Sequence, residues 1–457
     1  MPIDPPDPTP SRIVTPTGEP AGGSSAEPPP ARIVLPPGAS VDETDPLPEY
    51  PSLRPLEIVP VRDRDRDLLL VTDPLGVMPA PVALPLEALE LLRLLDGSVS
   101  LNDLAAEVVR GSSDLRAAGQ VRDFVAQLDR MLMLDSPRFE RAYAEARVSY
   151  HRLEIRQATL GDLSYPEDPS ELTRFLDQHF AEAERMRSEA GEAPVAADAA
   201  PRALLVPHLD PRRAGAAIAR AYLELGTATE PPLRVVLFGV GHALLQGRLA
   251  LTRKHFETPF GRIDCDLPFV DAVAAAVGEP AYREELVHRD EHSIEFQALY
   301  LRRRCGGRRL RLVPILCGGF HGLLEAGRTP REDEAFEALI QAVRDQAERL
   351  EGATLYMASA DLSHVGTRFG DPALDERTLG EVETSDRAAL EAARTGDADG
   401  WYGAIAAHQD STRVCGWAAI YAMLRCAAPE PGRLLCYQQS KEGDGSAVSV
   451  AAMAWSR

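Results

Sequence analysis

The sequence lacks long hydrophobic runs, paired cysteines and an excess of positive charge, and each absence argues against a class of protein. No stretch approaches the roughly 20 consecutive apolar residues that a membrane helix requires, so we expect no membrane partner. The six cysteines include no Cys-x-x-Cys pair, which in a chain of 457 residues favours a reduced, cytoplasmic setting over a disulfide framework. The net charge of -21 argues against a nucleic-acid partner, because phosphate binding needs a basic surface. We also expect no secretory signal, since the N-terminus has neither its positively charged nor its apolar segment.

Residues 1–66 are rich in proline, glycine, serine and acidic residues and have no sustained hydrophobic period. Such a segment buries too little apolar surface to offset the conformational entropy of the chain, so we expect a disordered tail. Two similar segments lie within it, Arg12–Gly18 and Arg32–Gly38, and each begins with Arg-Ile-Val. The similarity is typical of chance in low-complexity sequence, and a docking motif is the alternative.

Residues 67–137 are predicted to form two short strands, at 68–71 and near 82–84, followed by three amphipathic helices. The helices begin at Pro85, after Ser100 and near residue 118. With Leu-Asp-Gly-Ser-Val-Ser-Leu between the first two helices, the segment resembles the PqqD family of peptide-binding winged-helix modules. A DNA-binding winged helix is the competing interpretation, but no helix carries the row of Lys and Arg that phosphate contacts require.

A polar helical connector is expected at 138–155, and residues 156–457 alternate short apolar segments with helix-length amphipathic ones. This alternation predicts an α/β domain with a mainly parallel sheet flanked by helices. Two strands near the C-terminus are close enough in sequence to form an antiparallel edge pair. The predicted strands are 203–206, 234–238, 310–316, 354–357, 434–438 and 447–454, and the main helices are 213–225, 267–277, 292–304, 333–350 and 386–395.

Reactive side chains stand at the ends of several predicted elements. His208 and His242 each follow an apolar strand and precede a helix, and Cys415 precedes Gly416 at another boundary of this kind. Because the C-terminal ends of parallel strands meet at one edge of a sheet, we expect these side chains to converge. Imidazole and thiolate bind zinc, copper and iron, and three protein donors with an open position suit a reactive metal centre. Taken singly, a histidine after a strand is more typical of a hydrogen-bonded core residue.

Three further residues are candidates for the same site. Asp361 and His364 follow the strand at 354–357, and a carboxylate beside an imidazole suits a proton shuttle or a hydrogen-bond partner of a metal ligand. A helix cap with an incidental histidine is the alternative. His292 begins a helix within Glu-His-Ser-Ile-Glu, whereas His288 is expected outside that helix and is not assigned to the site.

Segment by segment, residues 156–457 resemble the Memo family, called AmmeMemoRadiSam system protein B in bacteria and archaea and akin to class III extradiol dioxygenases that use non-haem iron. The resemblance implies that His208, His242 and Cys415 bind one iron or copper ion. It also implies that His292, Asp361 and His364 act beside that ion in catalysis or proton transfer. The matching segments are Arg156-Gln157-Ala158 with Leu163-Ser164-Tyr165-Pro166, Asp168 to Leu172, Pro207-His208, Phe238 to His242, Glu291 to Glu295, Ser359 to Gly366, and Cys415-Gly416.

The chain departs from the family's motifs at three places. Leu209-Asp210-Pro211 stands where the family has Ala-Gly-Tyr, the segment before His242 lacks the family's proline, and Val365 replaces a common aromatic residue. The resemblance therefore names no small-molecule substrate. It implies a metal-dependent oxidoreductase-type site that acts with a radical SAM system. The separate resemblance of residues 67–137 to PqqD modules implies that they recruit that enzyme or a peptide, and a folded spacer or dimerisation piece is the alternative.

Two other classes of function stay open. Cys415, His364 and Asp361 could serve as nucleophile, base and orienting group of a hydrolase. The third class is a non-enzymatic scaffold that binds peptides or proteins.

Overall fold

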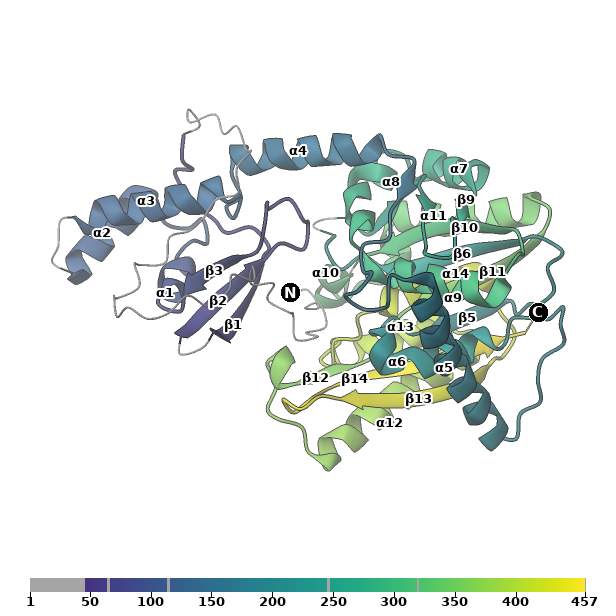
Figure 1. Cartoon of the computed structure of the whole chain (residues 1–457). Coiled ribbons are helices and arrows are strands. Elements are labelled where there is room, and N and C mark those ends of the chain that lie inside the picture. The colour runs from purple at the N-terminus through teal and green to yellow at the C-terminus, as the bar shows by residue number, and fades with distance from the viewer. Residues whose placement is uncertain (1–45, 64–65, 113–115, 245–246, 319, 457) are drawn as a thin grey trace, which may run out of the picture. The chain divides into compact units, whose positions relative to one another are not determined.

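The computed structural model describes residues 46–63, 66–112, 116–244, 247–318 and 320–456 (Figure 1). The chain divides into two compact units, residues 1–146 and 147–457. The first 45 residues of the expected tail, with both Arg-Ile-Val segments, lie outside the described residues. Among the described helices, none is long and apolar enough to cross a membrane.

The smaller unit combines a three-stranded antiparallel sheet with short helices. Strand β2 (Arg66–Thr72) lies between β1 (Glu57–Asp63) and β3 (Val82–Pro85). Alternate residues of β2, Leu69 and Val71, are buried in one cluster with Val125 and Leu128 of α3. The helices predicted after Ser100 and near residue 118 are observed, and the likeness to the PqqD family stays a prediction. The helices are α1 (Ala88–Leu92), α2 (Leu101–Ser112), α3 (Ala117–Arg130) and, across the boundary between the units, α4 (Pro137–His151).

The predicted tail ends before residue 66, because residues 57–63 form strand β1. Within the described sheet β1 pairs with β2 alone, and Pro60 stands opposite Leu69. An edge strand tolerates proline because one of its sides makes no hydrogen bonds to a neighbouring strand. The high proline content of residues 1–66 is the reason that the sequence did not predict this strand. Pairing on both sides makes β2 the central strand, so the edges of the described sheet belong to β1 and β3.

The larger unit is built on one mixed sheet of nine strands. Four parallel strands form its centre in the order β5, β11, β6, β10. Antiparallel strands flank them, β14 beside β5 and β7 beside β10, so the expectation of a mainly parallel sheet was wrong at the flanks. Strand direction there depends on partners far along the chain, which local patterns do not reveal. The predicted C-terminal antiparallel pair is present as β13 and β14.

The strands of the larger unit, including the separate pair β4 and β8, have the following bounds. They are β4 (Ile155–Arg156), β5 (Ala203–Val206), β6 (Leu233–Val240), β7 (Leu249–Leu251), β8 (His255–Phe256), β9 (Asp264–Cys265), β10 (Leu310–Cys317), β11 (Ala353–Ser359), β12 (His364–Gly366), β13 (Arg433–Lys441) and β14 (Ser446–Trp455).

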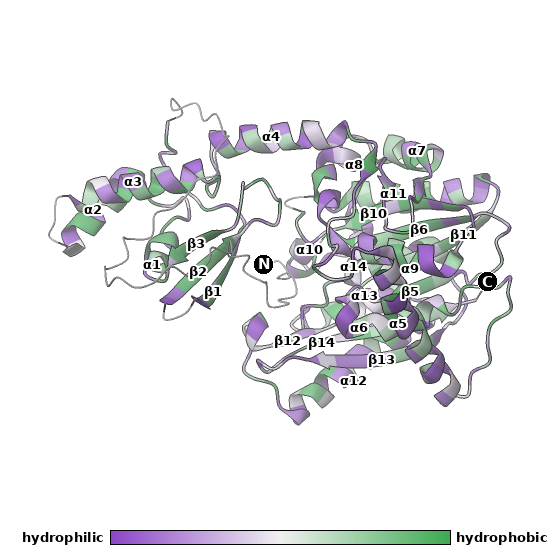
Figure 2. Ribbon diagram, viewed as in Figure 1, coloured by the Kyte–Doolittle hydropathy of each residue, from purple (hydrophilic) through white to green (hydrophobic). Residues whose placement is uncertain are grey.

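Helices cover both faces of this sheet. On one face α6 and α9 lie against the strands with α5 packed on them, and on the other α14 lies against the strands beside α7, α11 and α13 (Figure 1). Figure 2 shows the central strands β6 and β10 as mainly hydrophobic, as expected for strands covered on both faces. The helices are α5 (Pro169–Glu189), α6 (Pro211–Tyr222), α7 (Leu267–Val277), α8 (Pro280–Arg283), η1 (Glu285–Arg289), α9 (His292–Cys305), α10 (His321–Glu325), η2 (Pro330–Glu332), α11 (Glu334–Arg349), η3 (Thr367–Phe369), α12 (Glu376–Arg394), α13 (Ala398–Ala406) and α14 (Trp417–Ala427).

A buried ion pair fixes the start of α9. The side chains of Arg156 and Glu295 are only 0% and 1% exposed. The Glu295 carboxylate also accepts a hydrogen bond from the hydroxyl of Tyr165. Arg156 further donates to the carbonyl oxygens of His288 at 3.0 Å and Glu291 at 3.1 Å. The pair therefore holds the backbone that leads into α9.

We expect Glu295→Ala to lower the free energy of unfolding of the larger unit by about 3–5 kcal/mol, because it leaves the Arg156 guanidinium buried without its counter-charge. Urea unfolding followed by tryptophan fluorescence measures this unit alone, since all three tryptophans, Trp401, Trp417 and Trp455, lie in it. As a control, Glu383→Ala breaks an exposed pair with Arg387 and should cost less than about 1 kcal/mol. Equal losses in the two variants would contradict the role given to the buried pair.

Candidate metal centre

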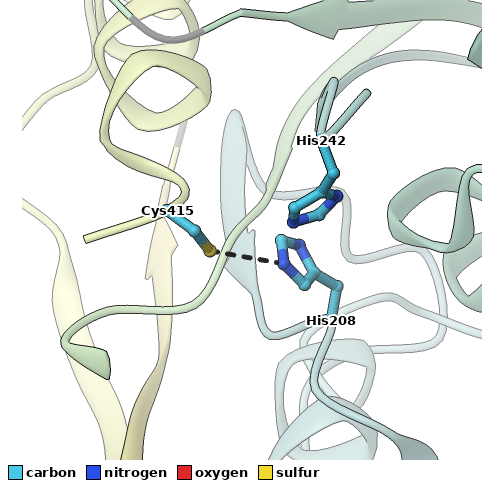
Figure 3. Close-up of side chains that lie close together, drawn as sticks. All are labelled: His208, His242 and Cys415. Carbon is cyan, nitrogen blue, oxygen red and sulfur yellow. Dashed lines mark hydrogen bonds between the residues drawn. The ribbon is translucent and has the colours of Figure 1, made fainter. Parts of the chain in front are cut away.

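Three donor side chains meet at one edge of the large sheet (Figure 3). One residue separates His208 from the end of β5, and one residue separates His242 from the end of β6. Cys415 lies just before α14. One nitrogen of each imidazole and the thiol sulfur all lie within 4.8 Å of one another. His208 is buried and the other two are half-buried. The structure thus brings together the three residues that the sequence predicted to converge.

Two glycines permit this convergence. A Cβ atom at Gly416 would lie 2.1 Å from Cβ of Ala360, so glycine allows the loop before α14 to approach the end of β11. A Cβ atom at Gly239 would lie 2.7 Å from Oγ of Ser293, so glycine in β6 allows α9 to pack closely. The Ser293 hydroxyl uses this proximity to donate to the carbonyl oxygen of Val240 at 3.1 Å.

The hydrogen bonds of His208 determine which ring nitrogen faces the site. Its Nδ1 lies 3.0 Å from the carbonyl oxygen of Ser359, which can only accept, so Nδ1 carries the proton and Nε2 keeps its lone pair. Nε2 lies 3.5 Å from Sγ of Cys415 and 3.7 Å from Oδ2 of Asp361. Burial lowers the pKa of His208 well below its usual 6.5, and two neighbouring imidazoles lower it further. The ring is therefore neutral at neutral pH, which is the form that binds metals.

Glu291 orients His242, and the sequence interpretation gave this carboxylate no role. Nδ1 of His242 lies 3.0 Å from Oε2 of Glu291, and the backbone N–H of His242 donates to the same oxygen at 3.2 Å. The carboxylate also caps α9 by accepting from the N–H of Ser293 at 2.8 Å. Burial acts to raise the pKa of Glu291, but the adjacent imidazoles and this amide outweigh it and hold the pKa well below 4.5. Its place at the N-cap within Glu-His-Ser-Ile-Glu was the signal that could have identified it.

His292 lies against both histidine ligands of the candidate centre. Its ring centroid is 5.1 Å from that of His208 and 4.7 Å from that of His242, and it is nearly parallel to the latter, at 18°. Nδ1 of His292 lies 3.3 Å from Oε1 of Glu291. His242, Glu291 and His292 form a second group of donor atoms within 4.8 Å of one another. The structure therefore places His292 beside the two histidines that were predicted to converge with Cys415.

Asp361 holds the backbone that carries His208. Its Oδ1 accepts hydrogen bonds from the N–H groups of His208 at 2.9 Å and Leu209 at 3.1 Å. The residue is 1% exposed. The loop after β11 thereby fixes the loop after β5.

The described contacts of His364 lead to the loop that carries Cys415. Its Nδ1 lies 3.0 Å from the carbonyl oxygen of Leu362 and 3.1 Å from that of Arg413, and its ring packs edge-on against Phe369. The imidazole that lies 3.5 Å from the Cys415 thiol is His208.

The loop before Cys415 has an unusual backbone. Gln409, Asp410 and Arg413 have φ values of 50°, 50° and 56°, in the left-handed region that non-glycine residues rarely adopt. The carboxylate of Asp410 accepts from the N–H of Val414 at 2.8 Å, and burial raises the pKa of Asp410 to about 7. Surrounding contacts therefore hold this loop in a conformation that it would not adopt alone.

Known proteins of the MEMO1 family are among those that this chain resembles. The family model described as "Memo-like protein" matches residues 156–455. A MEMO1 family protein of Aquifex aeolicus is 27% identical over 322 residues, which cover 70% of this chain and 77% of that protein. A MEMO1 family protein of Thermus thermophilus is 28% identical over 343 residues, 75% of this chain and 94% of that protein. A MEMO1 family protein of Methanosarcina acetivorans is 27% identical over 301 residues, which cover 65% of this chain and 97% of that protein.

We expect the His208 imidazole of the metal-free protein to stay neutral when the pH falls through 6.5, because burial opposes its protonation. Long-range nitrogen–proton NMR correlations of the imidazoles measure both the pKa and the tautomer, and His208→Gln assigns the signal. The neutral ring should carry its proton on Nδ1. A midpoint at or above 6.5, or a proton on Nε2, would disagree with the hydrogen bonds described above.

Proposed function

Because this chain belongs to the Memo family, we propose that its larger unit binds one redox-active metal ion, iron or copper, through His208, His242 and Cys415. The observation that carries this proposal is the meeting of one nitrogen from each imidazole and the thiol sulfur within 4.8 Å. Hydrogen bonds already hold Nδ1 of both imidazoles, so neither ring needs to turn to offer Nε2. Three protein donors leave coordination positions for a further ligand.

The chemistry of the donors fits a transition metal. Magnesium and calcium prefer oxygen ligands, whereas imidazole and thiolate suit iron, copper and zinc. The likeness to class III extradiol dioxygenases favours a redox-active ion over zinc. When bound, such an ion supplies one-electron exchange and a position for an oxygen-type ligand.

The surrounding residues have separate tasks in this proposal. The Ser359 carbonyl and the Glu291 carboxylate keep the protons of the two ligand imidazoles on Nδ1. Asp361 holds the backbone of His208. His292, next to both rings, holds or releases a proton beside the site. His364 holds the loop of Cys415 through the Arg413 carbonyl.

We expect protein loaded anaerobically with ferrous iron or cuprous copper to retain one ion per chain, and His208→Ala and Cys415→Ser to retain none, because each removes a donor. Glu291→Gln should weaken binding by roughly 10–100-fold, because the imidazole of His242 loses its anionic partner. Elemental analysis and competition with a chelator of known affinity give these values.

Two matched variants serve as controls for the metal measurement. Cys436→Ser removes another half-buried cysteine, and His321→Ala removes a histidine that neither donor group contains. Both should bind metal as the unaltered protein does. Equal metal in every variant would remove the proposed centre, and retention of zinc alone would keep the centre but remove its redox character.

A thiol-dependent hydrolase is the second candidate, favoured by the 3.5 Å between Sγ of Cys415 and Nε2 of His208. In this alternative His208 takes the thiol proton in place of His364, which the sequence interpretation gave as the base, and Asp361 is the acidic neighbour of the His208 ring at 3.7 Å. A thiol-reactive probe should label Cys415 in metal-free protein under either proposal. A chelator should abolish only a metal-dependent activity, which separates the two. A protein without turnover on catechol, peptide or thiol substrates would be a binding scaffold.

The smaller unit is proposed to recruit a radical SAM enzyme, or the peptide on which it acts, as a PqqD-like module. Support comes from its three-stranded sheet, because an extended peptide can add to a sheet edge through main-chain hydrogen bonds. The edges of the described sheet are β1 and β3. Val59, which is 39% exposed, lies in β1, one of these two edge strands.

We expect a photo-crosslinking amino acid at Val59 in the full chain to capture a radical SAM enzyme or its peptide in the native cell, because β1 offers an edge to an extended segment. The same amino acid at Val148, which is 51% exposed on α4, is the control and should capture neither. Mass spectrometry identifies the products. A crosslink from Val59 to Arg12–Gly18 or Arg32–Gly38 of the same chain would mean that the tail occupies the edge instead.

A further inference from the structure

A continuous series of contacts leads from His208 into the interior, away from Cys415. The carbonyl oxygen of Ser359 accepts from Nδ1 of His208 at 3.0 Å, and its hydroxyl accepts from Nε2 of Gln297 at 2.9 Å. Oε1 of Gln297 in turn accepts from the hydroxyl of Tyr222 at 2.8 Å. Ser359, Gln297 and Tyr222 are all fully buried. The candidate metal centre is therefore linked to a tyrosine in α6 by hydrogen bonds and, within Ser359, by the covalent bonds between its carbonyl and its hydroxyl.

A second tyrosine continues this series toward α5. The rings of Tyr222 and Tyr300 are stacked, with centroids 5.7 Å apart and planes at 13°. The Tyr300 hydroxyl lies 2.7 Å from Nδ1 of His179, whose ring is nearly parallel to the phenol at 14°. His179 is half-buried, so the series runs from the candidate centre to a partly accessible imidazole.

The position of His179 is shaped by a glycine. Gly215 lies within α6, where glycine is less favourable than alanine, and a Cβ atom there would lie 2.3 Å from Cε1 of His179. Burial lowers the pKa of His179 to about 4, so at neutral pH its Nδ1 can accept the phenolic proton. Burial also raises the pKa of both tyrosines well above 10, so both phenols are protonated at neutral pH.

We propose that Tyr300 and His179 form a redox-active pair that exchanges one electron with the three-donor site through Tyr222. On oxidation the O–H bond of Tyr300 breaks, its proton forms an N–H bond at Nδ1 of His179, and its electron reduces a one-electron oxidant at the site, the oxidised metal ion. The products are a neutral phenoxyl radical and an imidazolium, and the reverse step restores both residues. Only the inner end of this route rests on the proposed metal centre.

The arrangement separates the path of the electron from that of the proton. Hydrogen bonds join His208 to Ser359 and Ser359 to Tyr222 through Gln297, but the step from Tyr222 to Tyr300 is a stack of rings. A stack at this distance offers an electron close contact between two π systems but gives a proton no acceptor. The proton of Tyr300 therefore goes to His179, which lies in hydrogen-bond contact with it.

The first test uses metal-free protein, so it does not depend on the metal centre. A flash-oxidised ruthenium tris-bipyridine complex serves as the one-electron oxidant, in a Tyr50→Phe background that removes a tyrosine 54% exposed to solvent. Electron paramagnetic resonance should show a tyrosyl radical that Tyr300→Phe abolishes. Tyr356→Phe removes another buried tyrosine as the control and should leave the signal unchanged. A signal that persists in Tyr300→Phe would overturn the proposal.

The role of His179 has its own spectroscopic readout. In deuterium oxide the radical should show coupling to one exchangeable deuteron, the one transferred to Nδ1. His179→Gln should lose this coupling and shorten the radical's lifetime. Gly215→Ala, which displaces the ring while keeping His179, should act in the same direction. Unchanged coupling in His179→Gln would assign the proton to another group and reject the pair, and tryptophan fluorescence confirms that each variant is folded.

The inner end of the route is tested with protein that carries reduced metal. The radical should decay faster than in metal-free protein, because the reduced site returns one electron to Tyr300, and Tyr222→Phe should restore the longer lifetime. A radical at Tyr300 without any metal binding would reject the proposed metal centre and leave the pair intact. Metal binding with no radical at Tyr300 would reject the pair and leave the centre intact.

Discussion

The buried charges of Arg156 and Glu295 are the constraint on which the site depends most. Burying two charges is costly, and their attraction compensates only if their other hydrogen-bonding atoms are also satisfied. Here that requirement has a structural consequence, because Arg156 uses further donors on the carbonyl oxygens of His288 and Glu291. The backbone before α9 is thereby held in place. The ion pair thus supports the positions of Glu291 and His292 at the site through their backbone.

The parallel strands at the centre of the sheet supply the second constraint. β5 and β11 are neighbours that run in the same direction, so His208 and Asp361 leave the sheet at the same edge. Asp361 then ties the two loops together by accepting from two backbone N–H groups. Gln297 of α9 adds a further tie by donating to the carbonyl oxygen of Pro207 and the hydroxyl of Ser359. The end of β5, the loop after β11 and helix α9 therefore together fix the position of the His208 imidazole.

The sequence predicted the donors better than it predicted their partners. His208, His242 and Cys415 stand at the ends of elements and within family motifs, and both signals are local. The cap that Glu291 makes on α9 follows from its local motif, but its contact with His242 depends on α9 packing against the end of β6, which no local pattern reveals. Strand β1 was missed because proline composition outweighed its β-branched residues, and β7 because its partner lies far along the chain. Errors of this kind arise where tertiary contacts, and not local sequence, decide which segments pair as strands and which side chains meet.

The donors differ in how firmly the protein holds them, and this bears on how a metal would be bound. The two imidazoles are fixed by a carbonyl, a carboxylate and backbone amides that exist before any ion arrives. Cys415 follows a loop with three left-handed non-glycine residues, each of which costs on the order of 1–3 kcal/mol and persists only where the surroundings impose it. Those surroundings are the Asp410 carboxylate on the Val414 N–H and the buried start of α14. The histidines are therefore held through hydrogen bonds of their own rings, and the thiol is held through the backbone of the loop that precedes it.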